Sequence, residues 1–407
     1  MTEFERLVTD CNNLYEAYRK TIKGSIWKSA TQEFELDYLH QITKLSQELR
    51  DRTYHTSPCH PFTVDERGHK RSIRANTVRD RVVRRCLCDQ VLIPELRKHL
   101  IYDNGASLTG KGVSFTRRRL EQHLHHYYAK HGTNHGYILL IDFSRYYDNI
   151  RHDILREQIR KYIDDEFVHW LLDEIFESFK IDVSYLSDEE YETCLEQKFD
   201  LLVHDELPAE ILTGDKFMYK SLGIGDQTSQ ICSVFFPTTI DTYCKIVKGI
   251  HYYGRYMDDT YIIADNKDDL HEILDDITKL CKELGIFMNE KKTQISRLED
   301  GFKFMQIHYR LTDTGHLIRK MNKDRVTAMR RRLKGYKRLY DAGVLALEEI
   351  CNAYKSWMGS FAKYLSKQQR INLDTLFCSL FEREENSNGN ELYDDPARRH
   401  CAIASGS

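Results

Sequence analysis

The stretch from Gly249 to Ala264 constrains this chain more than any other. It reads Gly-Ile-His-Tyr-Tyr-Gly-Arg-Tyr-Met-Asp-Asp-Thr-Tyr-Ile-Ile-Ala, two aromatic and β-branched runs that meet at Met257, Asp258 and Asp259. Such runs on both sides of a short polar segment predict a β-hairpin with two carboxylates at its turn. Adjacent carboxylates repel each other unless a cation neutralises them, and their hard oxygen atoms suit Mg²⁺. A bare Asp-Asp turn is more often simply solvated, so the rest of the sequence has to separate these two interpretations.

A further carboxylate follows a second strand. Residues 137–141 form the nearly unbroken apolar run Tyr-Ile-Leu-Leu-Ile, which ends at Asp142. This run predicts a buried strand, and the helical spacing after it places Asp148 or Asn149 as a helix cap. A strand that ends in Asp142 beside the Asp-Asp hairpin would bring three carboxylates together. Such a cluster can hold two Mg²⁺ ions about 3.5–4 Å apart, one activating a primer 3′ hydroxyl and the other stabilising a triphosphate leaving group.

The motif Tyr-Met-Asp-Asp at 256–259, together with Asp142, resembles the active site of reverse transcriptases, and the resemblance extends over residues 13–364. It implies an α+β fold of the right-hand polymerase type, with fingers, a palm of antiparallel sheet and helices, and a helical thumb. It implies an RNA-directed DNA polymerase whose partners are template RNA, a DNA or RNA primer and dNTPs. The implied cofactor is a pair of Mg²⁺ ions, with Mn²⁺ as a substitute, and the implied metal ligands are Asp142, Asp258, Asp259 and the backbone carbonyl of Phe143.

The segment from Ile224 to Gln230 narrows the resemblance. Most reverse transcriptases read Gln-Gly-x-x-x-Ser-Pro here, whereas this chain reads Ile-Gly-Asp-Gln-Thr-Ser-Gln, which is similar to the bacterial and phage enzymes of diversity-generating retroelements. Those enzymes copy a template repeat with frequent errors opposite adenine, and they imply a small accessory protein. Replacing an amide by Ile224 would remove a polar contact to the nucleotide worth about 1 kcal/mol. Ile224, Gly225 and Gln230 are assigned to nucleotide binding, with plain packing as the alternative for Ile224.

The resemblance places four other side chains around the nucleotide. Tyr147 matches the aromatic gate that excludes a ribose 2′ hydroxyl, although an aromatic residue after an apolar strand is by itself more often part of a core. Arg71 matches the arginine that grips the triphosphate, because a planar guanidinium does this better than an ammonium. Lys70 is its expected helper. Lys291 or Lys292 supplies a proton or a charge to the departing pyrophosphate, and Lys292 is the residue assigned.

The net charge of −3 conceals an uneven distribution. Residues 69–130 carry fourteen Lys or Arg against five Asp or Glu, and residues 319–338 carry ten against one. Residues 182–215 carry eleven acids against one Lys. The basic blocks predict a groove that neutralises phosphates, with an affinity that falls steeply with salt; a solvated face is the alternative for each block alone. The expected nucleic-acid contacts are Arg81, Arg84, Lys111, Arg330, Arg331 and Lys334.

The resemblance also implies a domain organisation. Residues 1–136 are assigned to N-terminal helices and fingers, 137–310 to the palm and 311–380 to a helical thumb. The acidic segment 185–215 is read as an insertion in the palm, a solvated surface excursion in preference to a docking site for a basic partner. The polar residues 381–407 predict a disordered tail.

Composition bears on the compartment. No apolar run approaches the roughly 20 residues that span a bilayer. The first residues, Met-Thr-Glu-Phe-Glu-Arg, lack a basic start followed by an apolar stretch. Eleven cysteines are scattered without the spacing of a metal site. We expect a cytoplasmic protein in a reducing environment with no membrane partner.

Two other functions stay open. A phage-defence reverse transcriptase of the abortive-infection type shares the palm and can synthesise DNA without a template. A neighbouring template and variable repeat in the genome would exclude it. A non-catalytic, maturase-like RNA-binding protein could keep the fold without the chemistry, and the three intact carboxylates argue against that alternative.

Overall fold

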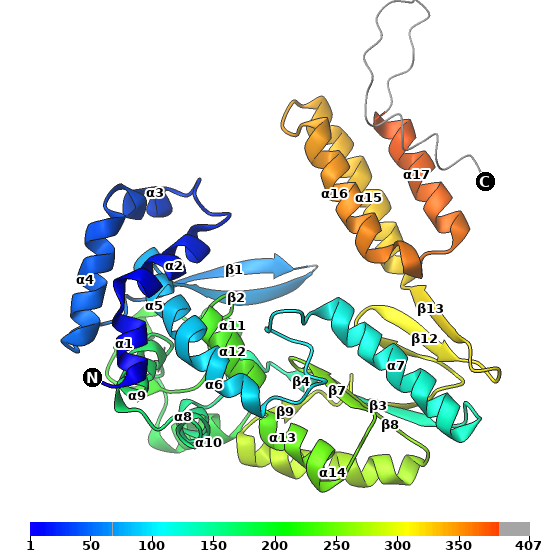
Figure 1. Cartoon of the computed structure of the whole chain (residues 1–407), viewed down its shortest axis with the longest axis horizontal. Helices are drawn as coiled ribbons and strands as arrows, with labels where there is room; N and C mark the ends of the chain where they lie inside the picture. The colour runs from blue at the N-terminus through cyan, green and yellow to red at the C-terminus, as the bar shows by residue number, and fades with distance from the viewer. Residues whose placement is uncertain (67, 382–407) are drawn as a thin grey trace, which may run out of the picture. The chain divides into compact units, whose positions relative to one another are not determined.

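The computed structural model describes residues 1–66 and 68–381 (Figure 1). They form two compact units, the first made of residues 1–123 and 137–295 and the second of residues 124–136 together with the chain from 296 onward. Helix α7 (Val113–His131) and strand β10 (Gln294–Arg297) run from one unit into the other. The division into fingers, palm and thumb stays a prediction. The tail that we expected to be disordered lies, from residue 382 on, outside the described residues.

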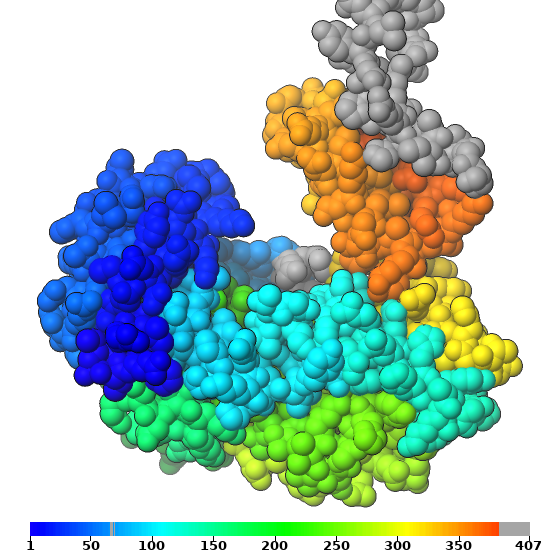
Figure 2. Space-filling model, in the orientation of Figure 1, coloured from blue at the N-terminus to red at the C-terminus, as the bar shows by residue number. Residues whose placement is uncertain are grey.

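The first unit begins with four helices, coloured blue in Figures 1 and 2. Apolar residues at helical spacing, among them Leu14 and Tyr18, are buried and form the start of the main core. The second of these helices packs against the later helix α5 (Val78–Leu87). The four helices are α1 (Glu3–Thr9), α2 (Cys11–Ile22), α3 (Ser29–Leu36) and α4 (Tyr38–Arg50).

An antiparallel hairpin follows, formed by β1 (His60–Glu66) and β2 (His69–Ala75). Its register pairs Val64 with Arg71 and Phe62 with Ile73. Helix α5 starts directly after it, with the Thr77 hydroxyl accepting a hydrogen bond from the Asp80 amide. The segment continues through η1 (Cys88–Leu92), α6 (Ile93–Leu96) and η2 (Arg97–His99).

The central sheet has the strand order β10-β3-β8-β7. Strand β3 (Tyr137–Ile141) pairs antiparallel with β8 (Asp259–Ala264), which in turn pairs with β7 (Tyr253–Tyr256). Helix α14 packs against β8 and helix α13 against α14, as Figure 1 shows below the sheet. Gly285, at φ 68, ends α14 in the left-handed conformation that glycine adopts most easily. The remaining elements around the sheet are α12 (Gln227–Phe235), α13 (Thr238–Thr242), η5 (Tyr243–Val247), α14 (Lys267–Leu284), β4 (Phe143–Ser144) and β9 (Phe287–Met288).

The acidic insertion is a folded element, which corrects the expectation of a solvated excursion. Strand β5 (Ile181–Asp182) pairs with β6 (Phe217–Met218), and the chain between them contains α10 (Asp188–Glu196), α11 (Leu201–His204) and η4 (Ala209–Ile211). It has a small apolar core of its own, because some of its apolar side chains point inward while most of its acids face solvent. That core consists of Ile181, Val183, Phe199, Leu201 and Met218. The preceding elements are η3 (Tyr147–Asn149), α8 (His152–Arg160) and α9 (Glu166–Glu177).

The second unit combines a small sheet with helices. Strands β11 (Phe302–Phe304), β12 (Ile307–Leu311) and β13 (Leu317–Met321) form an antiparallel sheet. The turn between β11 and β12 has positive φ at both Met305 and Gln306, the pattern of a type I′ hairpin. The helices that follow, orange to red in Figure 2, are α15 (Lys323–Asp341), α16 (Leu347–Phe361), η6 (Ala362–Tyr364) and α17 (Lys367–Phe381).

None of the helices in the described ranges combines the length and the apolar character that crossing a membrane demands.

Candidate active site

The β7–β8 hairpin predicted from the sequence is confirmed. Tyr256 pairs with Asp259, so Met257 and Asp258 form a two-residue loop. Met257 has φ 54, and a left-handed conformation outside glycine costs about 1–3 kcal/mol. The surrounding structure supplies the restraint, since Nη1 of Arg255 donates a hydrogen bond of 3.2 Å to the Met257 carbonyl. The hydrogen bond from Arg255 thus holds the loop that carries the carboxylates in a strained conformation.

Arg255 is itself fixed by a buried carboxylate, Asp241, and we did not predict this pair. Its Nε and Nη2 donate to the two oxygens of Asp241 at 2.9 and 2.5 Å, and Nη2 also donates to the Val234 carbonyl at 2.8 Å. The hydroxyl of Tyr253 donates to the same carboxylate at 2.5 Å. The hairpin is therefore anchored to the chain of α12 and α13. The available signal was an arginine inside an otherwise apolar strand.

Asp142 is delivered to the same corner by strand β3. Ile141 pairs with Thr260, which places the following residue beside the hairpin. Its Oδ2 accepts a hydrogen bond of 3.0 Å from Nδ2 of Asn289 and lies 3.1 Å from Nζ of Lys292. The backbone carbonyl of Asp142 accepts from the Asn289 amide at 2.8 Å. The structure thus brings together the predicted first carboxylate and the lysine chosen for pyrophosphate, and Asn289 is a neighbour that we did not predict.

The three carboxylates act on one another electrostatically. Burial, followed by the negative charge of Asp142, raises the pKa of Asp258 to about 6. Burial, followed by the charges of Asp258 and Asp142, raises the pKa of Asp259 to about 7. Lys292 opposes both shifts, and Arg71 opposes the one at Asp258. The corner therefore concentrates like charges that its own cations do not balance.

This donor set fits a divalent cation by its chemistry, because hard carboxylate oxygens with raised pKa values gain most from a nearby positive charge. In residues 1–66 and 68–381, however, no three acidic, histidine or cysteine side chains are already arranged to hold a metal ion. Asp142 is engaged by Lys292 and Asn289 instead. A metal ion at this corner would compete with Lys292 for Asp142. The backbone carbonyl of Phe143, in strand β4, stays a predicted ligand.

Tyr147 and Arg71 reach the carboxylate corner from two different segments. The Tyr147 hydroxyl accepts a hydrogen bond of 3.0 Å from Ser233 on α12 and lies 4.0 Å from the sulfur of Met257. Burial raises the pKa of Tyr147, and the charges of Asp258 and Arg71 also act on it. Lys70 is adjacent to Arg71 in strand β2, so their side chains point to opposite faces of the hairpin. The structure therefore directs only one member of this predicted pair toward the corner.

The glycine motif opens helix α12. The Asp226 side chain caps this helix by accepting from the Ser229 amide at 3.0 Å, which confirms the predicted helix start. Gly225 has φ 99, and a Cβ there would lie 3.8 Å from Cγ2 of Ile73 in strand β2. Ile224 is half-buried, whereas Gly225 and Gln230 are exposed. The motif therefore lies against the hairpin that carries Arg71, and its nucleotide contacts stay predictions.

The prediction that Arg84 contacts template phosphates is wrong, and so is the alternative of a solvated face. Its exposed fraction is 0%. Nη2 donates to the Ser178 hydroxyl at 2.7 Å, Nη1 lies 3.5 Å from an oxygen of Asp226, and the guanidinium stacks over the Phe179 ring. A buried charge needs such partners, and here it supports the residue that caps α12. Arg81, by contrast, is half-buried and donates to the Thr21 carbonyl at 3.0 Å.

Lys111 is tied to the protein more closely than a free phosphate ligand would be. Nζ donates to the Tyr102 carbonyl at 2.6 Å and lies 3.8 Å from the centroid of the Phe115 ring. Burial lowers its pKa. The other predicted nucleic-acid contacts lie on α15 in the second unit and stay predictions; Arg331 and Lys334 are exposed there and Arg330 is half-buried.

The predicted capping role of Asp148 and Asn149 is also wrong. Helix α8 begins only at His152, and its cap residue makes no side-chain hydrogen bond. Asn149 instead binds the backbone of Phe199 in both directions, at 2.8 and 3.1 Å. Asp148 accepts from the Leu201 amide at 3.3 Å, and burial raises its pKa to about 6. Both side chains hold the insertion, which explains why a local helix signal failed.

Comparisons with known proteins place this geometry in a family. The family model of the reverse transcriptase (RNA-dependent DNA polymerase) matches residues 66–309. A search among curated proteins finds no match. Solved structures with a similar fold include apo telomerase from Candida tropicalis, at 15% identity and a TM-score of 0.43, which covers 80% of this chain and 62% of that chain.

Two other telomerase structures give similar values. Telomerase from Candida albicans in complex with a TWJ fragment of telomeric RNA has 14% identity and a TM-score of 0.42, covering 86% of this chain and 64% of that chain. The Candida tropicalis enzyme truncated from its C-terminal domain has 16% identity and a TM-score of 0.42, covering 69% and 59%. This chain spans less than two thirds of the length of all three.

The matched region contains most of the features described above. It includes the β1–β2 hairpin from Glu66 onward, Asp142, the glycine motif and the Asp258–Asp259 loop, and it covers more than half of the 407 residues. The predicted fold class, an α+β right-hand polymerase fold with helices and antiparallel sheets, is confirmed. The chain belongs to the reverse transcriptase (RNA-dependent DNA polymerase) family.

Proposed function

We propose that this chain is an RNA-directed DNA polymerase that extends a primer with dNTPs on a template RNA, with two Mg²⁺ ions as cofactor and Mn²⁺ as a substitute. The observation that carries the proposal is the carboxylate corner. Three acids from two distant segments act on one another there, and burial with mutual repulsion raises the pKa of Asp258 to about 6 and that of Asp259 to about 7. Membership of the family supplies the reaction class.

The side chains around the corner have distinct tasks in this reaction. Bound divalent ions would activate the primer 3′ hydroxyl and stabilise the leaving group. The guanidinium of Arg71 binds the triphosphate, which matches a planar fork of donors. Lys292 pairs with Asp142 at 3.1 Å in the free protein. A cation held by Asp142 would release Nζ of Lys292, which could then donate a hydrogen bond or a proton to the departing pyrophosphate.

Selection of deoxyribose is assigned to Tyr147. Its hydroxyl is fixed by Ser233 at 3.0 Å, so the ring cannot swing aside without losing that bond. The sulfur of Met257 lies 4.0 Å from the same hydroxyl and from the Ser233 hydroxyl. A rigid aromatic wall beside the sugar leaves no room for a 2′ hydroxyl.

We further propose that the enzyme copies with low fidelity, as in diversity-generating retroelements, with a structured template RNA and a small accessory protein as partners in the cytoplasm. The support is the apolar Ile224 in a position directly before the exposed Gly225. An aliphatic side chain offers no hydrogen bond to the nucleotide. Discrimination by one such contact is worth about 1 kcal/mol, so its absence raises misincorporation several-fold.

Primer extension by the purified full-length chain tests the activity. We expect Mg²⁺-dependent extension of a DNA primer on an RNA template with labelled dNTPs. Asp258→Asn should lower it by about 10³-fold or more, since the metal site loses a charge, while template binding persists. Asp275→Asn is the matched control, because that aspartate is exposed on α14. Full activity in Asp258→Asn would refute the assignment.

Sequencing the extension products tests the fidelity proposal. Ile224→Gln should lower errors opposite adenine several-fold, because it restores a polar group. Ile224→Val keeps the position apolar and serves as control. An unchanged error spectrum in Ile224→Gln would contradict the role given to Ile224 and leave the polymerase assignment intact.

A further inference from the structure

Strand β2 presents two faces with different surroundings. Successive side chains of a strand point in opposite directions. Arg71 and Ile73 share one face: Ile73 lies against Gly225 of the glycine motif, and the charge of Arg71 acts on Asp258. Ser72 and Arg74 share the other face. That second face meets the insertion.

The contact with the insertion converges on one carboxylate. Nη2 of Arg74 donates to Oδ1 of Asp205 at 2.5 Å, and the Ser72 hydroxyl donates to the other oxygen. The side chains of Arg74 and Asp205 are only 18% and 19% exposed. Although burial raises it, the His204 ring 3.7 Å away, the hydrogen bond from Ser72 and the charge of Arg74 hold the pKa of Asp205 below its ordinary value. Asp205 is therefore ionised and held by the hairpin at neutral pH.

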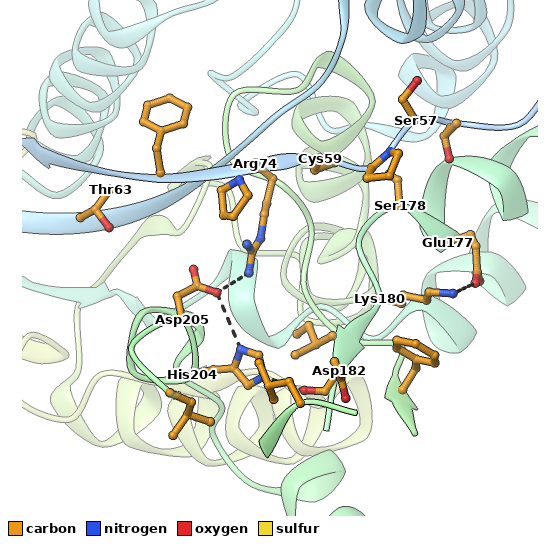
Figure 3. A pocket seen from close by; sticks show the side chains of 18 residues that line it. Ser57, Cys59, Thr63, Arg74, Glu177, Ser178, Lys180, Asp182, His204 and Asp205 are labelled. Atoms are coloured by element: carbon orange, nitrogen blue, oxygen red, sulfur yellow. Dashed lines mark hydrogen bonds and ion pairs between the residues drawn. The ribbon is translucent and has the colours of Figure 1, made fainter. Parts of the chain in front are cut away.

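These contacts cross a hollow. A cavity of about 680 Å³ lies between the hairpin, the end of α9 and the insertion. Figure 3 shows Arg74 and Asp205 pointing toward each other within it, with His204 beside them. Close packing does not support the hairpin over this area. The polar link through Asp205 consequently contributes much of the restraint on this face of β2.

Other residues of the insertion are bound firmly to the neighbouring chain. The ammonium of Lys220 is fully buried and donates to the carbonyls of Cys194, Leu195 and Gln197 at 3.2, 3.2 and 2.7 Å, at the end of α10. Arg145 pairs with Asp200 at 2.6 Å. Arg145 and Asn149 attach the insertion to the segment that follows Asp142, and Lys220 is bridged to Arg151 of the same segment. The bond at Asp205 therefore holds the hairpin in position relative to the carboxylate corner.

We propose that Asp205 is a positioning residue through which the insertion braces the β1–β2 hairpin, so that Arg71 on the opposite face of β2 meets the triphosphate of the incoming nucleotide. The proposal rests on the polymerase function proposed above. A braced hairpin costs less ordering when the nucleotide binds, which strengthens nucleotide binding without touching the reacting atoms. The expected signature is a change in KM for dNTPs with kcat preserved.

Steady-state extension kinetics give the first test. Asp205→Ala should raise KM for dNTPs about tenfold, with kcat within about twofold and template binding unchanged, because only the restraint on Arg71 is lost. Asp205→Asn keeps the shape and acceptor oxygen but loses the charge, so it should lie between Asp205→Ala and the parent. Asp188→Asn is the matched control: Asp188 pairs with Lys216 at 2.7 Å within the insertion and does not reach β2.

Hydrogen exchange in the free protein gives the second test and needs no activity. Asp205→Ala should accelerate exchange of the β1–β2 amides about tenfold, while the central sheet and Asp188→Asn stay as in the parent. Unchanged hairpin exchange overturns the brace, whatever the kinetics. A uniform loss of protection across the first unit also overturns it, since that marks a general fold defect. An inactive parent protein would refute the polymerase function separately. The hydrogen-exchange measurement would still test whether Asp205 braces the hairpin.

Discussion

The β7–β8 hairpin contacts the buried Asp241 and itself carries Asp258 and Asp259. Only the charge of Asp241 is neutralised by a neighbouring cation. Asp241 receives Arg255 through two hydrogen bonds and Tyr253 through a third, and its side chain is 1% exposed. At the loop, burial and like charge raise the pKa of Asp258 to about 6 and that of Asp259 to about 7. The fold can thus balance a buried carboxylate at this hairpin. The imbalance at the loop is therefore a property of the site, and a cation from solution would relieve it.

The cations beside these two carboxylate sites differ in the same way. Arg255 is 1% exposed and its planar fork is fully engaged, whereas the Lys292 side chain is 65% exposed and pairs with Asp142 at 3.1 Å. An exposed ammonium is easily displaced, and its contribution is screened by solvent. The balanced pair builds the hairpin, and the unbalanced group remains open to a ligand.

The largest effect is expected from breaking the balanced pair. Arg255→Met leaves Asp241 buried without its partner and frees the Met257 carbonyl, so the free energy of unfolding should fall by about 3–5 kcal/mol. Denaturant unfolding measures it. Lys292→Met, which removes an exposed cation from the other site, should cost less than about 1 kcal/mol. Equal losses for the two variants would contradict the distinction.

A smaller effect of opposite sign is expected at the unbalanced pair. The folded pKa of Asp259 is about 7, above the ordinary 3.8. Its protonated form stabilises the fold at low pH, and this contribution is lost as pH rises from about 4 through about 7. The Asp259→Asn variant has no group that ionises at this position, so it does not lose this stability as pH rises. At pH 8 without metal it should be more stable than the parent by about 2 kcal/mol. Urea unfolding with EDTA at pH 5 and pH 8 measures it; a variant less stable at both would sink the argument.

The smallest effect concerns the ion itself. If Mg²⁺ binds the folded corner and not the unfolded chain, as proposed, then at ten times its Kd it should add about 1.4 kcal/mol to the stability of the parent protein at pH 8. Asp259→Asn should respond less. Thermal unfolding with and without Mg²⁺ provides the readout. An equal response in both proteins would place the ion elsewhere.

The sequence predicted the elements whose signals are local. The Asp-Asp hairpin and the strand ending in Asp142 each depend on residues within a few positions. The prediction for Arg84 was wrong because the burial of its side chain is set by Asp226, which lies far along the chain. A charged residue in an amphipathic helix gives no local sign of such a partner.

Asn149 shows the same limit in the opposite direction. Its position before a helical segment favours a cap, yet its side chain binds Phe199 in the insertion. The carboxylate cluster was predictable in its membership but not in its present arrangement, because Lys292 engages Asp142. Periodicity identifies which segments meet; it does not identify which of two competing polar partners a side chain selects.

Lys220 has a practical consequence for studying the insertion. Burial lowers its pKa to about 8, and its amine is enclosed by three carbonyl groups. An amine-reactive label would therefore be slow to modify it in the intact protein and faster once the insertion detaches, because the three carbonyl groups then no longer enclose the amine. The labelled fraction of this one lysine, followed by mass spectrometry, would count the molecules whose insertion has come loose.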